Sequence, residues 1–362
     1  MENRAYNFAA GPSALPEEVL KEAQRDLFCY PGAGCSVMEM SHRSPSYQKI
    51  IDDAENTLRK LMNIDQNYAV LFLQGGASLQ FSMVPMNLMH QGECAAYIDS
   101  GNFANKAMVE CARWGKAVCA GSSKADKYTY IPQIKNSDIP SDAKYLHITG
   151  NNTIFGTTYN SLPNHAKKPL VCDWSSAILG KEINVNDYDL IYAGAQKNMG
   201  PAGLTVVIVK KDLILDPVDE VVPVMMRYKQ QIENGSMYNT PPCWSIYMAG
   251  LVFKWVESNG GVLEMQKRNT LKSNMLYDLI DNSDIYKNPV LKKDRSITNV
   301  VFTLPTQELT DKFIAESKEA NIINIKGHKL VGGLRASIYN GVSIDNVNYL
   351  CDFMKKFEKE NK

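Results

Sequence analysis

The sequence predicts an α/β protein in which a large domain built around a β-sheet is followed by a smaller α+β domain. Short apolar runs rich in β-branched residues alternate with segments of helical periodicity, which is the pattern of a sheet covered by helices. At 362 residues the chain exceeds the ~250 to 300 residues at which a single hydrophobic core stops growing. The pattern changes near Asn259-Gly260-Gly261, where we expect the large domain to end.

The first part of the chain predicts two helices and a buried strand. The first helix is expected at 17–28, and Ser44 or Ser46 is a candidate N-cap for a second helix at 47–62. An apolar run at 68–73 predicts a strand, and glycines lead from it into a third helix. Such a turn lets the free N–H groups at the start of a helix face an anion.

Further β-prone runs follow at intervals, separated by helical or loop segments. They begin near Ala95, Tyr145, Leu170, Leu190 and Leu204. In an open α/β sheet the ligand binds beyond the carboxyl ends of the strands. The loops after these runs are therefore the places where we expect functional residues.

After the glycine pair the remaining chain predicts a small α+β domain. Its elements are a helix at 262–281, a strand at 297–304, a helix at 307–321, a hairpin within 327–340 and a closing helix at 344–359. The chain contains no internal repeat and no low-complexity tract, so we expect no long linker.

The composition is that of an ordinary globular protein. Hydrophobic residues make up 44% and charged residues 22% of the chain, and 39 Lys and Arg balance 39 Asp and Glu. General nucleic-acid binding needs a basic excess, so we expect no nucleic-acid partner. The N-terminus lacks the apolar core of a signal peptide, and no run of about 18 apolar residues could span a bilayer. We therefore expect no membrane partner either.

The eight cysteines include no Cys-x-x-Cys pair, and no His cluster has the spacing of zinc ligands. Several cysteines stand in apolar runs, as buried free thiols do. This usage predicts a reducing, cytoplasmic location and no metal site.

Lys197 is the strongest candidate for a reactive group. An apolar run at 190–194 ends in small residues before it, and a turn with Gly200, Pro201 and Gly203 follows it. A loop lysine is usually a solvated surface residue without chemistry. Here the flanks on both sides are apolar or small, so we expect a partly desolvated amine with a lowered pKa. Such an amine is nucleophilic and can condense with an aldehyde.

Asp173 ends another apolar strand, 24 residues before Lys197, a spacing that fits neighbouring strands with a short connection. Pyridoxal phosphate needs a lysine for its aldehyde and an acidic group that keeps its pyridine nitrogen protonated. An aspartate and a lysine at strand ends are compatible with this cofactor without specifying it.

The segment from Tyr192 to Gly203, Tyr-Ala-Gly-Ala-Gln-Lys-Asn-Met-Gly-Pro-Ala-Gly, closely resembles the cofactor-lysine segment of the phosphoserine aminotransferases, within the class V aminotransferases. The resemblance extends over essentially the whole chain. It implies fold type I, with a large domain over 16–259 that has a mainly parallel seven-stranded sheet flanked by helices. The small domain would combine 260–362 with the N-terminal segment 1–15.

The resemblance also implies how pyridoxal phosphate would be held. Lys197 would bind the aldehyde and transfer protons, and Asp173 would face the ring nitrogen. Phe103 would stack on the ring, where many relatives have tryptophan. Thr153 would hydrogen-bond the 3-oxygen, and Gln196 would complete this part of the site.

For the cofactor phosphate, the resemblance implies the backbone at Ala77 and the backbone and hydroxyl at Ser78, a position where some relatives have arginine. It further implies that Asn239 and Thr240 reach the phosphate bound to the neighbouring subunit. The expected assembly is therefore a two-fold homodimer with shared active sites.

For the substrates, the resemblance implies Arg335 as the clamp of the α-carboxylate. The distal anion would be bound by His42, Arg43, His328 and Lys329, although many relatives have arginine at the last position. The implied reaction moves the amino group of L-glutamate to 3-phosphohydroxypyruvate, giving O-phospho-L-serine and 2-oxoglutarate in L-serine biosynthesis. A related phosphohydroxythreonine of pyridoxine synthesis is a further substrate of this kind.

Two other functions stay open on the residues alone. A lyase similar to a cysteine desulfurase would need a mobile nucleophilic cysteine, but the only cysteine after Cys243 is Cys351, inside the predicted closing helix. Those enzymes also stack a histidine on the ring, where this chain has Phe103. The third function is a non-catalytic anion-binding protein in which Lys197 is structural. Borohydride bleaching of a yellow protein would exclude it.

Overall fold

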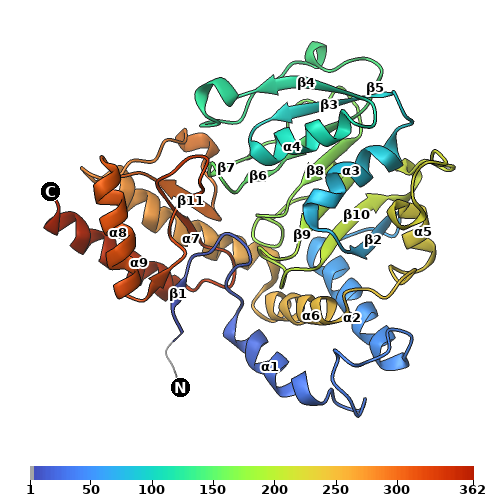
Figure 1. Cartoon of the computed structure of the whole chain (residues 1–362), viewed down its shortest axis with the longest axis horizontal. Coiled ribbons are helices and arrows are strands. Elements are labelled where there is room, and N and C mark those ends of the chain that lie inside the picture. Colours follow the sequence, from blue (N-terminus) through green and yellow to red (C-terminus); the bar gives the residue numbers. More distant parts are fainter. Residues whose placement is uncertain (1–3) are drawn as a thin grey trace.

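The computed structural model of the chain describes residues 4–362, and its larger part is organised around a seven-stranded sheet (Figure 1). The strand order is β2-β10-β9-β8-β5-β3-β4, and β10 runs antiparallel to its two neighbours while the other pairs are parallel. The predicted mainly parallel seven-stranded sheet is therefore confirmed. Its strands are β2 (Tyr68–Leu73), β3 (Cys94–Asp99), β4 (Lys116–Ser122), β5 (Ala143–Thr149), β8 (Leu170–Asp173), β9 (Leu190–Gly194) and β10 (Thr205–Lys210).

Helices cover both faces of this sheet (Figure 1). Side chains alternate between the faces along each strand, as the period of two requires. In β9, Ile191 and Ala193 enter one hydrophobic core, whereas Leu190 and Tyr192 enter the other. The first face is covered by α1 (Glu17–Phe28), α2 (Pro45–Met62) and α6 (Cys243–Ser258), and the second by α3 (Gly76–Leu88), α4 (Asn102–Cys111) and α5 (Tyr228–Glu233).

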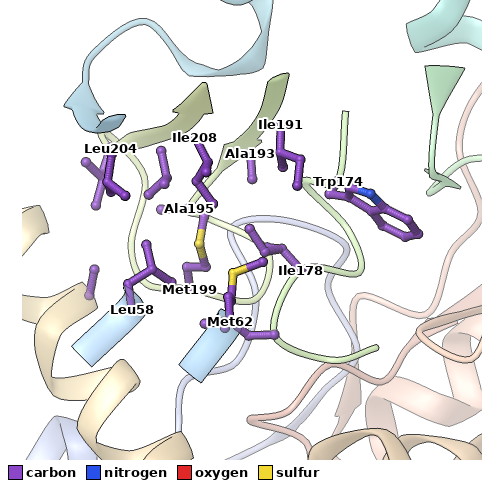
Figure 2. Close-up of a cluster of buried hydrophobic side chains, with 14 of the residues drawn as sticks. Leu58, Met62, Trp174, Ile178, Ile191, Ala193, Ala195, Met199, Leu204 and Ile208 are labelled. Carbon is purple, nitrogen blue, oxygen red and sulfur yellow. The ribbon is translucent and has the colours of Figure 1, made fainter. Parts of the chain in front are cut away.

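The turn that carries Lys197 is anchored in the first of these cores. Met199, two residues later, is fully buried and points into the cluster that includes Met62 of α2 and Ile208 of β10 (Figure 2). Ala195 is fully buried as well. The backbone at residue 197 is thus held by apolar packing on both sides.

A third hydrophobic core lies in the C-terminal part of the chain and also takes in Phe8. The N-terminal segment joins it because β1 (Tyr6–Asn7) pairs in parallel with β12 (Ile322–Ile323). The antiparallel pair β11 (Asn299–Phe302) and β13 (Leu334–Ser337) supplies its strands. Its helices are α7 (Gly261–Asp281), α8 (Gln307–Glu319) and α9 (Ile344–Glu360). The division of the chain between residues 259 and 260 stays a prediction.

The remaining elements are short. A two-residue pair, β6 (Asn151–Asn152) with β7 (Thr157–Thr158), follows the central strand β5. Single 3₁₀ turns occur at Lys124–Asp126, Asn136–Asp138, Val185–Asp187, Lys211–Leu213, Val224–Met226 and Lys292–Asp294. In the part of the chain from residue 4 onward, no helix combines the length and the apolar character needed to cross a bilayer.

The sequence missed or shifted several elements. The second helix begins at Pro45 rather than Tyr47, because proline suits the first helical position, and Ser44 is its N-cap. Strand β4 was not predicted, since it lies at the sheet edge and only one of its residues is buried. The predicted hairpin is confirmed only as a short pairing of Lys326 with Leu334, while β13 pairs mainly with β11.

Candidate active site

The side chain of Lys197 meets residues from two other elements beyond the end of β9. Its Nζ atom donates a 2.7 Å hydrogen bond to Oγ1 of Thr153, in the loop after β6. The same atom lies 5.0 Å from the ring centroid of Phe103, in the first turn of α4. Three of the predicted site residues therefore converge on one point.

The N-terminal segment closes over the backbone of this lysine. Ser13 donates its N–H to the carbonyl of Gln196 at 3.0 Å and its hydroxyl to the carbonyl of Lys197. At Gly11, where φ is +146°, a Cβ atom would lie 3.2 Å from Cγ of Lys197. The side chain of Gln196 lies over Gly194, where a Cβ atom would be 2.7 Å from its Oε1, and it also lies near Gly11.

Asp173 ends β8, the strand next to β9, and only 5% of it is exposed. Its Oδ1 atom accepts the N–H of Ser175 at 2.9 Å and the hydroxyl of Ser175 at 2.6 Å. Ser175 Oγ in turn accepts the N–H of Gly194 at 3.0 Å, which directs the hydroxyl proton to Asp173. None of the hydrogen bonds within residues 4–362 uses Oδ2, so this oxygen is available to a ligand.

Asp173 and Lys197 influence each other as charges without touching. Burial raises the pKa of Asp173, and the charge of Lys197 and the Ser175 donors lower it in part. Burial lowers the pKa of Lys197 to about 8, against the opposing effect of Asp173 and together with that of Arg335. No ion pair within 4.0 Å joins the two groups in the described part of the chain. The charged atoms of the two groups are therefore more than 4.0 Å apart.

The start of α3 offers an anion cradle at the same edge of the sheet. Thr205 of β10 pairs with both Leu73 of β2 and Gly194 of β9, so β2 and β9 end at the same level on either side of β10. The N-cap Gly75 has φ of +87°, and no side chain within residues 4–362 caps the helix. The first-turn N–H groups, including those at Ala77 and Ser78, therefore have no partner in the helix.

Gly75 is required at this cap. A Cβ atom there would lie 2.5 Å from Cδ2 of Leu79. The hydroxyl of Ser78 is exposed at the cap and adds a donor to the backbone groups.

A group of cations lies next to Arg335. Arg335 Nη1 donates to the carbonyl of Thr153 at 3.3 Å, and its buried Nε has no partner within residues 4–362. Arg335 and His328 line a cavity of about 640 Å³. Burial lowers the pKa of His328, and the charges of Arg335, Lys329 and Lys106 lower it further. A half-buried arginine with a buried, unpaired Nε donor, beside three more basic groups, is an arrangement suited to an anionic substrate.

Two predicted pairs are not brought to Lys197 within one subunit. Asn239 and Thr240 both contact Gln74 instead. Asn239 Nδ2 donates to Gln74 Oε1 at 3.3 Å, and Gln74 Nε2 donates to the backbone carbonyl of Thr240 at 3.3 Å. His42 and Arg43 lie in the loop before α2, and no hydrogen bond or ion pair of residues 4–362 joins their side chains to the Lys197 site. Their roles stay predictions.

Sequence reasoning missed three residues of the site. Ser175 had a detectable signal, because an aspartate side chain often accepts the backbone N–H of the residue two positions later. Lys106 stands one helical turn after Phe103 and its Nζ lies 5.9 Å from that ring, so the helical period places both on one face. Ser13 had no signal, since its partner is 184 residues away.

The donor set fits pyridoxal phosphate. A half-buried amine, a buried carboxylate with one free oxygen, an aromatic ring and an uncapped helix start match its aldehyde, ring nitrogen, ring face and phosphate. Among residues 4–362 no group of three or more His, Cys, Asp or Glu is placed to hold a metal ion. The chemistry offered is acid–base and nucleophilic chemistry at one amine.

Comparison with known proteins gives one consistent result. The family model described as "Aminotransferase class-V" matches residues 5–350. The phosphoserine aminotransferase of Halalkalibacterium halodurans is 49% identical over 355 residues, which are 98% of each chain. That of Lactococcus lactis subsp. lactis is 52% identical over 363 residues, covering 98% of this chain and 99% of the relative.

Solved structures agree. The phosphoserine aminotransferase from Bacillus circulans subsp. alkalophilus has a TM-score of 0.96 at 42% identity, with all of both chains covered. The enzyme from Trichomonas vaginalis, solved with bound pyridoxal phosphate, has a TM-score of 0.92 at 34% identity over 97% of this chain and all of that one.

Proposed function

The chain belongs to the aminotransferase class-V family, and on that premise we propose that it transfers the amino group of L-glutamate to 3-phosphohydroxypyruvate. The products would be O-phospho-L-serine and 2-oxoglutarate, as in L-serine biosynthesis. The observation that carries the proposal is the pairing of a desolvated amine at Lys197 with an opposed carboxylate at Asp173, beside the cations around Arg335. This arrangement suits nitrogen transfer to acids that carry a second negative group.

The enzyme uses pyridoxal phosphate. When bound, this cofactor supplies an electron sink for the electron pair released as the substrate α-carbon loses its proton. The proposed contacts follow from the free groups of the site: Lys197 at the aldehyde, Asp173 Oδ2 at the ring nitrogen, Phe103 on the ring face, Thr153 at the 3-oxygen, Gln196 beside the lysine, and Ala77 and Ser78 at the phosphate.

In the first half of the reaction, Lys197 Nζ would take the proton from the α-carbon of glutamate and pass it to the carbon of the cofactor aldehyde group. In the second half it would move a proton the opposite way, to the α-carbon of the oxo acid. An amine can do so only when it is neutral, and its lowered pKa of about 8 raises the neutral fraction near physiological pH. Thr153 holds the amine in place through its 2.7 Å hydrogen bond. The two hydrogen bonds from Ser175 favour the charged form of Asp173 against the effect of burial.

Substrate binding would use the cations of the site. The guanidinium of Arg335 has the fork geometry for an α-carboxylate, and its unpartnered Nε is one of the two donors that such a clamp needs. His328 and Lys329 would hold the distal carboxylate or phosphate. His42 and Arg43 would act on the same anion from a second subunit, because no hydrogen bond or ion pair of residues 4–362 joins their side chains to Lys197 within one subunit.

We propose a homodimer in which Asn239 and Thr240 of one subunit reach the phosphate bound to the other. Two apolar side chains near the segment of His42 are exposed in the single chain, Phe28 at 91% and Met38 at 61%, as expected of surface that a second subunit covers. Light scattering is expected to give about twice the chain mass of 40.4 kDa. A monomer that is fully active would contradict the shared site.

The assay that tests the function couples glutamate with 3-phosphohydroxypyruvate and follows 2-oxoglutarate. Hydroxypyruvate, which lacks the phosphate, is the matched control and is expected to be a much poorer acceptor, since it leaves the cations unpaired. Equal rates with both acceptors would exclude the phosphorylated substrate. Nothing favours the desulfurase-like lyase: Cys351 is 5% exposed within α9 and is not a mobile nucleophile.

Arg335→Ala is expected to raise the KM for both amino donors, at a cost of roughly 2 to 5 kcal/mol of binding, because the variant leaves the substrate carboxylate without its charged partner. Arg335→Lys should recover part of this loss, since lysine keeps the charge but not the fork. Arg113→Ala is the control, because Arg113 is exposed and its one ion pair within residues 4–362 is with Glu110. Steady-state kinetics with glutamate and with phosphoserine measure the effect, and an unchanged KM would remove Arg335 from the site.

The rate at which pyridoxal phosphate combines with the cofactor-free protein is expected to rise with pH and to level off above about pH 8. Only the neutral amine attacks an aldehyde, and burial lowers the pKa of Lys197 to about 8, so the reactive form grows as pH rises through that value. An unperturbed lysine, with a pKa near ~10.4, would still gain reactivity beyond pH 10. Stopped-flow absorbance at stepped pH distinguishes the two profiles, and Lys197→Ala should lack this phase.

A further inference from the structure

Three buried asparagines meet directly behind Lys197, and we call Asn198, Asn269 and Asn340 the asparagine junction. They come from the turn after Lys197, from α7 and from the segment after β13. Asn198 is 6%, Asn269 0% and Asn340 9% exposed. The junction therefore lies where the sheet-bearing part of the chain meets the C-terminal part.

Each asparagine is hydrogen-bonded across that boundary. Asn198 Oδ1 accepts the backbone N–H of Asn340 at 2.9 Å, and Asn198 Nδ2 donates to the carbonyl of Ile178 at 2.7 Å. Asn340 Nδ2 donates to the carbonyl of Leu179 at 2.9 Å. Asn269 Nδ2 donates to Oδ1 of Asn340 at 2.8 Å and to the carbonyl of Gly180 at 3.0 Å.

Gly180 allows the three amides to approach. A Cβ atom at this position would lie 2.9 Å from Nδ2 of both Asn198 and Asn269, and 3.2 Å from Oδ1 of Asn340. Any side chain there would push the amides apart. The absence of a Cβ atom at residue 180 is thus part of how the junction is built.

Lys272, one turn after Asn269 on α7, holds the other side of the segment after β13. Its Nζ atom donates to the carbonyls of Ile338, Tyr339 and Val342 at 2.8, 2.9 and 2.7 Å. These bonds use all three protons of the ammonium group, and the side chain is 1% exposed. The backbone that presents the N–H of Asn340 to Asn198 is therefore fixed from both sides.

The two ends of this hydrogen-bonded path are functional. Asn198 follows Lys197 directly, and the segment 338–342 follows β13, which carries Arg335. We propose that the asparagine junction sets the position of the Lys197 amine relative to Arg335, so that Asn198, Asn269 and Asn340 are positioning residues for amino transfer. The inference rests on the proposed roles of Lys197 and Arg335.

A second link between the same two groups does not replace the junction. Thr153 accepts from the amine of Lys197 through its hydroxyl and from Arg335 through its carbonyl. That link joins the tips of two long side chains, whereas the junction joins the backbones on which they stand. Long side chains can rotate, so the backbone link is the one that keeps their relative placement.

The test compares Asn198→Ala with Asn87→Ala in the holoenzyme. Asn87 is also fully buried, in α3 on the other face of the sheet. Its Nδ2 donates to the carbonyls of Met83 and Met226, and its Oδ1 accepts the N–H of Tyr228. Both variants lose buried hydrogen bonds and should melt earlier than the wild type. Only Asn198→Ala is expected to lower kcat/KM for glutamate, by about 100-fold, the loss typical of a misplacement of about 1 Å.

Two further measurements separate a positioning role from lost stability. The pH midpoint of the visible absorption of the holoenzyme, recorded without substrate, is expected to shift in Asn198→Ala. In Asn87→Ala it is expected to keep the wild-type value. Asn269→Ala leaves Asn198 in place. It removes only the two hydrogen bonds that Asn269 Nδ2 donates, because Oδ1 of Asn269 has no partner within residues 4–362. This variant should therefore fold, and its pH midpoint should shift in the same direction as that of Asn198→Ala.

Unchanged midpoints and kinetics in Asn269→Ala, or equal shifts in Asn87→Ala, would overturn the inference. Absence of transaminase activity in the wild type would instead overturn the proposed function. The substrate-free midpoint still reports on the junction in that case, so the two failures are distinguishable.

Discussion

Lys197→Ala is expected to abolish amino transfer, with a fall of at least about 10⁴-fold, while the chain stays folded. The change removes both the nucleophile for the aldehyde and the base that moves the proton, and the acid–base role alone is worth roughly 10² to 10⁴-fold. The only hydrogen bond that the side chain makes within residues 4–362 is the one to Thr153. Loss of one hydrogen bond and of a poorly solvated charge should leave the melting temperature nearly unchanged.

Lys181→Ala is the matched control for this variant. Burial lowers the pKa of Lys181 to about 8 as well, but its amine is bonded to the carbonyl of Tyr159 and to Asn160. A lowered pKa without a free path to the cofactor should not support catalysis. Mass spectrometry after borohydride treatment should find the cofactor attached to the wild type and to Lys181→Ala, and not to Lys197→Ala. Turnover in Lys197→Ala would disprove the assignment.

Asp173→Asn is expected to lower kcat by roughly 10²- to 10⁴-fold, because loss of the carboxylate that would face the protonated ring nitrogen removes about 3 to 5 kcal/mol of buried charge pairing. The carboxylate would no longer hold the proton on the ring nitrogen, so the cofactor would accept electrons poorly. The amide oxygen of asparagine can still accept the two bonds from Ser175, so the fold around the residue is retained.

The stability of this variant is expected to change in the opposite direction to its activity. Burial raises the pKa of Asp173 in the folded state, so the folded chain binds the proton more strongly than the unfolded chain does. Stability therefore falls as pH rises from the unfolded pKa through the raised folded value, and the buried charge is unfavourable at neutral pH. Cofactor-free Asp173→Asn should melt at the same temperature as the wild type or higher.

Asp26→Asn provides the contrast in sign. Asp26 is 3% exposed, and its hydrogen bonds with Arg25 and Tyr247 lower the pKa of its carboxyl below the ordinary value. Removing that charge should lower the melting temperature at neutral pH and leave kcat unchanged. The comparison needs only calorimetry and the transaminase assay. If Asp173→Asn behaved like Asp26→Asn in both measurements, Asp173 would be a structural residue.

Much of the fold was readable from local pattern. Apolar runs of strand length between amphipathic helices identified six of the seven strands of the main sheet and the long helices, because burial on both faces of a sheet demands such runs. The edge strand β4 escaped for the same reason, since one buried residue leaves no apolar run. Helix ends were predicted to within a few residues where a cap such as Ser44 marks them.

The chemistry of the site was readable wherever a segment carries its own signal. The small and apolar residues around Lys197 predicted a desolvated amine. Asp173, at the end of the neighbouring strand, predicted the carboxylate that would face the ring nitrogen. Both expectations depend only on residue type and on a short stretch of chain.

What only the tertiary structure decided are the contacts between segments that are far apart in the chain. Three hydrogen bonds show this: Ser13 donates to the carbonyl of Lys197, Arg335 donates to the carbonyl of Thr153, and the N–H of Asn340 donates to Asn198. In each of them the two partners are 142 to 184 residues apart in the chain. No local propensity encodes such pairs, because each depends on how two hydrophobic cores settle against each other. The sequence by itself therefore determined which groups react, and the packing of those cores determined where they stand.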